Sequence, residues 1–136
     1  MRLSNMGLAL VLAILPLAAA DAPYVGKWKM DPAKSDFGSS TITYAQLASG
    51  EMQSTADGQS YKFKMDGKDY PDPFGATAAW KSLDANTWQT TWKLNGKTLN
   101  TDDLKLSSDG KTLTINSRTS KADGTTETTM SVYDRQ

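Results

Sequence analysis

Hydrophobic and polar residues alternate along most of the chain beyond position 23, so that every second side chain shares a face. In the segment 61–65, two lysines alternate with three hydrophobic residues. Alternation of this kind predicts β-strands with one buried face and one face toward water. Eight or nine strands are expected, at residues 24–30, 39–47, 51–56, 61–65, 78–83, 87–94, 97–106, 112–120 and 125–133.

Five Asp-Gly or Asn-Gly dipeptides separate these segments, and they begin at Asp57, Asp66, Asn95, Asp109 and Asp123. Such dipeptides supply the positive φ angles that tight β-hairpins require. The last three recur every 14 residues, and the residues that follow the dipeptides at 95 and 109 are near copies of each other. The chain therefore predicts a meander of antiparallel hairpins, in which strands that follow one another are neighbours.

These hairpins favour an all-β fold, an antiparallel up-and-down β-barrel, over a sandwich of two sheets. Closure into a barrel removes exposed strand edges and suits strands that are joined in sequence. The predicted barrel is one domain that spans residues 21–136.

Three places interrupt the alternation. The segment from Asp66 to Ala79 contains Pro71 and Pro73, which cannot donate ladder hydrogen bonds, so a long surface loop is expected there. Between Leu99 and Leu104 the hydrophobic residues change face, which predicts a β-bulge or bend around Asp102-Asp103. Asp31 followed by Pro32 predicts either one helical turn with an aspartate cap or an irregular loop.

Residues 1–20 have the pattern of a secretory signal peptide, with Arg2, an apolar run that reaches Leu17 and three alanines. The alternative is a retained membrane anchor, but the apolar run is short for a bilayer. We expect cleavage before Asp21 and export to the periplasm or the medium, with no stable membrane insertion after cleavage.

The chain has 15 basic and 15 acidic residues, and no histidine or cysteine. Removal of Arg2 with the signal leaves 14 basic against 15 acidic residues, so nucleic acid is not indicated as a partner. Thiol nucleophiles, imidazole catalysis and ordinary zinc sites are excluded.

No cofactor, metal or catalytic residue is predicted, and an enzyme is not expected. A calcium site at Asp66, Asp69 and Asp72 and a hydrolase with paired carboxylates remain as alternatives.

The aromatic residues on the inward faces are the candidates for function. A barrel of this size either fills its interior with side chains or leaves a pocket for one small ligand. We therefore expect Trp28 to close one end, and the remaining aromatic residues to form either the core or the wall of a pocket. The candidate ligand-binding residues are Tyr44, Tyr61, Phe63, Trp80, Trp88 and Trp92.

The tripeptide Gly26-Lys27-Trp28 resembles the G-x-W signature of lipocalins and related calycin barrels. Further segments are similar to small exported bacterial proteins of unassigned function that are described as lipocalin-like, namely 26–35 with Phe37, 66–71, 109–113 and 132–136. The resemblance covers nearly all of residues 21–136 and implies a calycin-type barrel.

Fatty-acid-binding proteins also carry a G-x-W, and an Arg-x-Tyr on their last strand grips the ligand carboxylate. The corresponding place here reads Ser131-Val132-Tyr133, so the arginine of that motif is missing. Arg118 is the nearest substitute, but its position in the alternation places it on the outer face.

Three functions are compatible with these observations. The preferred one is a secreted carrier of a small apolar molecule, with the segment from Asp66 to Ala79 as a lid. The second is an envelope or extracellular protein-interaction barrel with a packed interior. The third is a carboxylate-based hydrolase. The sequence identifies neither the ligand nor a protein partner.

Overall fold

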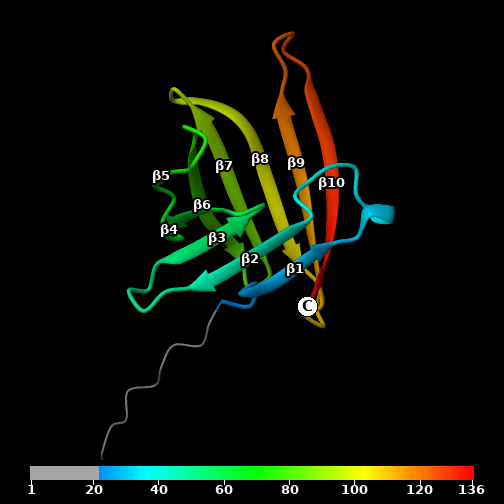
Figure 1. Cartoon of the computed structure of the whole chain (residues 1–136). Helices are drawn as coiled ribbons and strands as arrows, with labels where there is room; N and C mark the ends of the chain where they lie inside the picture. The colour runs from blue at the N-terminus through cyan, green and yellow to red at the C-terminus, as the bar shows by residue number, and fades with distance from the viewer. Residues whose placement is uncertain (1–21) are drawn as a thin grey trace, which may run out of the picture.

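The structure is a computed structural model, and it describes residues 22–136. The predicted signal peptide, residues 1–20, lies outside the described residues. Ten strands form a single antiparallel sheet, in which β1–β3 cross in front of β7–β10 (Figure 1). The strands are β1 (Gly26–Met30), β2 (Thr41–Gln46), β3 (Met52–Ala56), β4 (Gln59–Phe63), β5 (Asp69–Pro71), β6 (Thr77–Asp84), β7 (Thr87–Leu94), β8 (Lys97–Leu106), β9 (Thr112–Ser120) and β10 (Thr126–Arg135).

The expected antiparallel up-and-down barrel is confirmed, but it is nearly closed rather than fully closed. Every strand pairs with its sequence neighbours except at one seam, and β1 pairs with β10 to join the two ends of the chain. The seam lies between β4 and β5, which are the two edges of the sheet. The interior is therefore enclosed by ten strands with one unpaired boundary.

The expected count of eight or nine strands is wrong because the segment from Asp66 to Ala79 is not a continuous loop. It contains the short strand β5 and the first residues of β6, and Tyr70 pairs with Ala78. Pro71 is tolerated because β5 is an edge strand, where one side of the backbone needs no partner. The prolines shorten this strand without preventing it.

Four of the five predicted turn dipeptides join paired strands, and Asp57 and Asn95 adopt φ angles of 50° and 51°. The fifth, Asp66-Gly67, connects β4 to β5, which do not pair. Of the two alternatives expected at Asp31, the helical turn is the one present, as a 3-10 turn (η1, Pro32–Lys34) capped by the Asp31 carboxylate.

The predicted bulge lies in β8, but not at Asp102-Asp103. Trp92 pairs with Asn100 and the next residue, Lys93, pairs with Thr98, so the irregularity falls at Leu99. Pairing of β8 with both neighbours is regular through Asp102. The prediction misplaced the bulge because a change of face between Leu99 and Leu104 does not show at which residue it occurs, and Asp102 keeps the inward direction of Leu104.

One end of the barrel is closed by Trp28 and Arg135. Trp28 is fully buried, and the Arg135 guanidinium lies over its ring, 4.3 Å from the centroid. The guanidinium also donates to the carbonyls of Pro23, Val25 and Gly110. A side chain at position 26 would place its Cβ 2.7 Å from the guanidinium, which explains the glycine at that place. Trp28 therefore belongs to the core, as predicted.

Arg135→Ala should lower the free energy of unfolding by about 2–4 kcal/mol, because it removes three hydrogen bonds of a charged group and a cation–π contact. Arg118→Ala is the matched control, since Arg118 forms one exposed ion pair with Asp103 and should cost less than about 1 kcal/mol. Urea unfolding measures both. Equal effects of the two substitutions would contradict the role assigned to Arg135.

Candidate functional site

A cavity of about 780 Å³ lies within the barrel and opens to solvent. Its wall is built by inward side chains of β2–β4 and β6–β10 together with two loop segments, 36–39 and 72–74. Small-molecule sites in proteins commonly measure about 300–1,000 Å³. The cavity is therefore large enough for one small organic molecule.

The strand register places one row of polar side chains across the inner face of β7–β10. Thr90 pairs with Asp102, Asp102 pairs with Ser117, and Ser117 pairs with Thr129. All four residues line the cavity, and the next inward residues toward the closed end are Leu104 on β8 and Ile115 on β9. We call this row the polar belt, and it is defined by Thr90, Asp102, Ser117 and Thr129.

Tyrosine and tryptophan side chains form the wall on the side of β2–β4 and the seam. Trp80 Nε1 donates to the hydroxyl of Tyr61 at 3.0 Å, and the Tyr61 ring meets the Trp92 ring edge-on at 5.6 Å between centroids. Tyr44 meets Trp80 edge-on at 5.8 Å. Burial raises the pKa of both Tyr44 and Tyr61, so their hydroxyls stay protonated at neutral pH.

Asp102 is the one carboxylate of the polar belt, and its partners are neutral. Trp92 Nε1 donates to one oxygen at 3.0 Å, Asn100 Nδ2 donates to the other at 2.9 Å, and Ser117 also hydrogen-bonds the group. The four ion pairs among residues 22–136 use other carboxylates. Burial is the main cause of the raised pKa of Asp102, and the three hydrogen bonds offset it only in part.

Thr90 lies opposite Asp102 in the sheet and is 1% exposed. Its Oγ1 has no hydrogen-bond partner within residues 22–136, and the residue lines the cavity. Buried hydroxyls in folded proteins are usually hydrogen-bonded, because leaving one unpaired costs about 1–3 kcal/mol. Within the described part of the chain, Thr90 thus has an unpartnered hydroxyl at the wall of the cavity.

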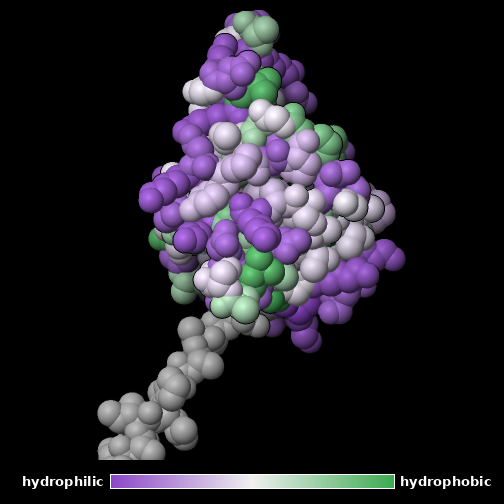
Figure 2. Space-filling model, turned by 60° about the vertical axis from the view of Figure 1, so that its left-hand side comes forward, coloured by the Kyte–Doolittle hydropathy of each residue, from purple (hydrophilic) through white to green (hydrophobic). Residues whose placement is uncertain are grey.

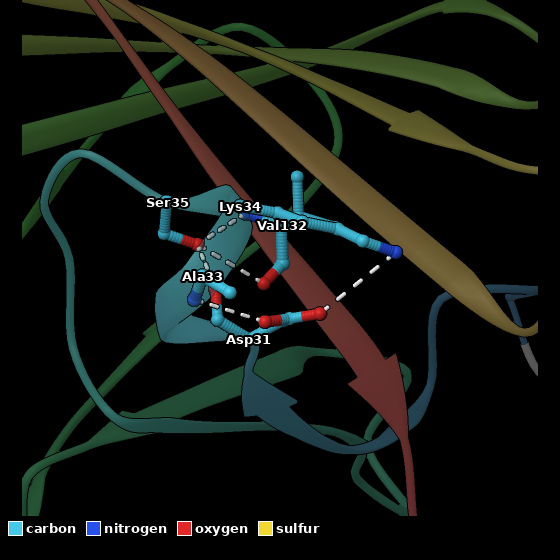
Figure 3. A network of polar contacts seen from close by, with 5 residues as sticks. All are labelled: Asp31, Ala33, Lys34, Ser35 and Val132. Carbon is cyan, nitrogen blue, oxygen red and sulfur yellow. Dashed lines mark hydrogen bonds and ion pairs between the residues drawn. The ribbon is translucent and has the colours of Figure 1, made fainter.

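The mouth of the cavity includes a segment that is held against β10 by hydrogen bonds. Ser35 Oγ accepts from the amide of Val132 at 2.9 Å and contacts the carbonyls of Val132 and Asp31 (Figure 3). Beyond Ser35, Ser131 Oγ donates to the Phe37 carbonyl and the Tyr133 hydroxyl donates to the Ser39 carbonyl at 2.8 Å. These bonds hold the segment 36–39 at the cavity wall.

The structure brings together four of the six predicted ligand-binding residues. Tyr44, Tyr61, Trp80 and Trp92 line the cavity. Phe63 and Trp88 do not line it and belong to the core, where Phe63 stacks on Trp80 at 4.4 Å and Trp88 contacts Tyr24 at 4.7 Å. That the four wall residues contact a ligand stays a prediction.

Sequence reasoning missed Thr90 and Asp102 as site residues. Their strand alternation contained the signal, because Asp102 lies two positions before the buried Leu104 and therefore faces inward if the strand is regular. Arg118, by contrast, lies on the outer face as predicted and pairs with Asp103.

The three aspartates weighed as a calcium site do not converge. Asp66 accepts from the Tyr70 hydroxyl at 2.6 Å, Asp69 pairs with Lys93 at 3.2 Å, and Asp72 accepts from the amide of Phe74 at 2.9 Å. Among residues 22–136, no group of three or more acidic side chains is arranged to hold a metal ion.

Neither a protein-family model nor a curated protein sequence matches the chain. In the described part of the chain, no helix has the length and apolar character needed to cross a membrane.

Asp102→Asn should stabilise the ligand-free protein at neutral pH and have little effect near about pH 3. Since burial raises the pKa of Asp102, the folded state holds the proton more tightly than the unfolded chain does. Below the unfolded-state pKa the carboxyl is neutral in both states. As the pH rises through the raised folded-state pKa, the wild type loses stability relative to the variant, by about 1.4 kcal/mol for each pKa unit.

Urea unfolding of both proteins at several pH values measures this difference. Asp103→Asn is the control, because Asp103 is paired with Arg118 on the outer face and its removal should not stabilise the protein. A variant at position 102 that becomes less stable than the wild type as the pH rises would contradict the predicted sign.

Proposed function

We propose that this protein is a lipocalin-like carrier that binds one small, largely apolar molecule inside its barrel. The observation that carries the proposal is the cavity of about 780 Å³ with a wall of Tyr44, Tyr61, Trp80 and Trp92. Aromatic walls bury much apolar ligand surface at little entropic cost. The protein acts after export from the cytoplasm, as the pattern of residues 1–20 predicts.

The cavity argues against the alternative of a barrel with a packed interior. Protein cores are close-packed and contain few voids larger than a water molecule. The side chains inside this barrel leave a much larger space at the level of the polar belt. An interaction surface also lacks support on the face drawn in Figure 2, where hydrophobic residues form small separate patches among hydrophilic ones.

The alternative of a hydrolase requires a second carboxylate in reach of Asp102. The other three carboxylates that line the cavity have partners of their own. Asp36 accepts from the amide of Met130, Asp72 accepts from that of Phe74, and Glu127 pairs with Lys121. This arrangement favours binding over hydrolysis.

In this proposal a ligand enters between the two loop segments at the mouth of the cavity, 36–39 and 72–74. Phe37 and Phe74 line the cavity and are 76% and 78% exposed, so each presents an aromatic ring to solvent at the rim. In this proposal the segment 72–74 acts as the lid that the sequence suggested for the region from Asp66 to Ala79. Exposed rings at a rim offer the first contact for an apolar ligand.

The neutral fluorescent probe N-phenyl-1-naphthylamine should bind the purified protein at one saturable site, because the aromatic wall accepts an uncharged apolar molecule. A double variant that fills the cavity, Ala56→Phe with Ser117→Phe, should weaken binding by about tenfold or more. Both positions line the cavity. Probe fluorescence at constant protein concentration measures the affinity.

The control for this experiment is Thr55→Phe with Asn116→Phe, which places the same side chains at the neighbouring outward positions of β3 and β9. Far-ultraviolet circular dichroism checks that both variants fold. Absence of saturable binding, or equal loss in the two variants, would contradict a ligand site inside the barrel.

A further inference from the structure

The charged residues at the cavity wall are all acidic. Asp36, Asp72, Asp102 and Glu127 line the cavity, and none of the described lining residues is lysine or arginine. Three of these carboxylates lie at the mouth with partners of their own, which leaves Asp102 as the carboxylate of the interior. The cavity therefore favours positive charge over negative charge.

The position of Asp102 needs an explanation, because a carboxylate inside a barrel is costly unless a cation balances it. Its hydrogen bonds from Trp92, Asn100 and Ser117 hold both oxygens in place but supply no charge. By contrast, Asp103 on the outer face of the same strand is paired with Arg118. The balancing charge is therefore absent from residues 22–136.

Thr90 gives an independent indication of a ligand at the same place. Its side chain is 1% exposed, its Oγ1 has no partner among the described residues, and it faces the cavity directly across the sheet from Asp102. A hydroxyl oxygen accepts hydrogen bonds from N–H groups. Thr90 and Asp102 are therefore neighbouring acceptors at the cavity wall, and Thr90 Oγ1 receives no hydrogen bond from residues 22–136.

We propose that the ligand is an organic cation with N–H donors on an apolar body, that its charged nitrogen pairs with Asp102, and that Thr90 accepts a second N–H. This inference rests on the proposed ligand site and narrows its ligand to one chemical class. The apolar body lies against Tyr61 and Trp92, whose rings also attract a cation at close range. A fatty acid is disfavoured, because its carboxylate would meet Asp102 and no lysine or arginine of the described lining residues.

Three compounds that share a naphthyl group and differ in charge test the proposal. They are 2-(1-naphthyl)ethylamine as the cation, 2-(1-naphthyl)ethanol as the neutral analogue and 3-(1-naphthyl)propanoate as the anion. Isothermal titration calorimetry with the full purified protein at pH 7.5 measures each affinity. We expect the amine to bind more tightly than the alcohol by about tenfold or more, and the anion to bind most weakly.

Asp102→Asn should abolish the preference for the amine while the alcohol keeps its affinity. Asp103→Asn, with the same change on the outer face, should retain the preference. Thr90→Val is a second test that does not depend on the first variant. It should weaken the binding of the amine several-fold more than the binding of the alcohol. Asp102→Asn removes a charge and Thr90→Val removes a hydroxyl, each without a large change in volume, and thermal unfolding checks that both variants fold.

The outcomes separate this inference from the carrier proposal. If the alcohol and N-phenyl-1-naphthylamine bind but the amine shows no preference, the assignment of a cation is overturned and the carrier proposal stands. If none of the compounds and probes binds, both are overturned. A preference for the amine that survives in Asp102→Asn would overturn the role of Asp102.

Discussion

At one place the barrel is held together by contacts between side chains, because backbone hydrogen bonds are missing there. No ladder joins β4 to β5, and the indole of Trp80 on β6 spans the seam. Its ring stacks on Phe63 with an interplanar angle of 13°, and its Nε1 donates to Tyr61. The same residue contacts Tyr24 and Tyr44 on the other side of the interior. One tryptophan thus fixes both the seam and part of the cavity wall.

Large aromatic residues at the seam and small polar residues opposite them produce the cavity. The inward positions of the polar belt on β7, β9 and β10 are Thr90, Ser117 and Thr129, whose side chains are too small to fill the space. Toward the closed end the inward residues become Leu106 and Leu113, and packing is complete. The strand register therefore gives the barrel two parts. One end is packed and stabilises the fold, and the other contains an open volume that a ligand can occupy.

Most of the fold follows from local patterns, whereas the site follows from packing across the sheet. The bounds of β7, β8 and β9 match the alternation and the turn dipeptides, because both signals act over a few residues. The strand β5 was missed because an edge strand tolerates Pro71, which reads locally as a loop. The inward direction of Asp102 was missed because the change of face was placed at Asp102-Asp103, whereas it occurs at Leu99.

The pattern of a single strand does not show whether its aromatic residues belong to the packed core or to the wall of the cavity. Phe63 and Tyr61 share a face of β4, yet Phe63 is packed in the core and Tyr61 lines the cavity. The difference depends on the side chains of strands far away in the sequence. For the same reason the unpartnered hydroxyl of Thr90 becomes visible only in the folded barrel.

Native mass spectrometry of the protein isolated from its own host without detergent is the most direct test of a carrier barrel. We expect an additional mass that is present under native conditions and disappears on denaturation, and its composition should include a basic nitrogen. A native mass equal to the denatured mass, unchanged after exposure to an extract of host metabolites and lipids, would contradict the assignment of the cavity to a ligand.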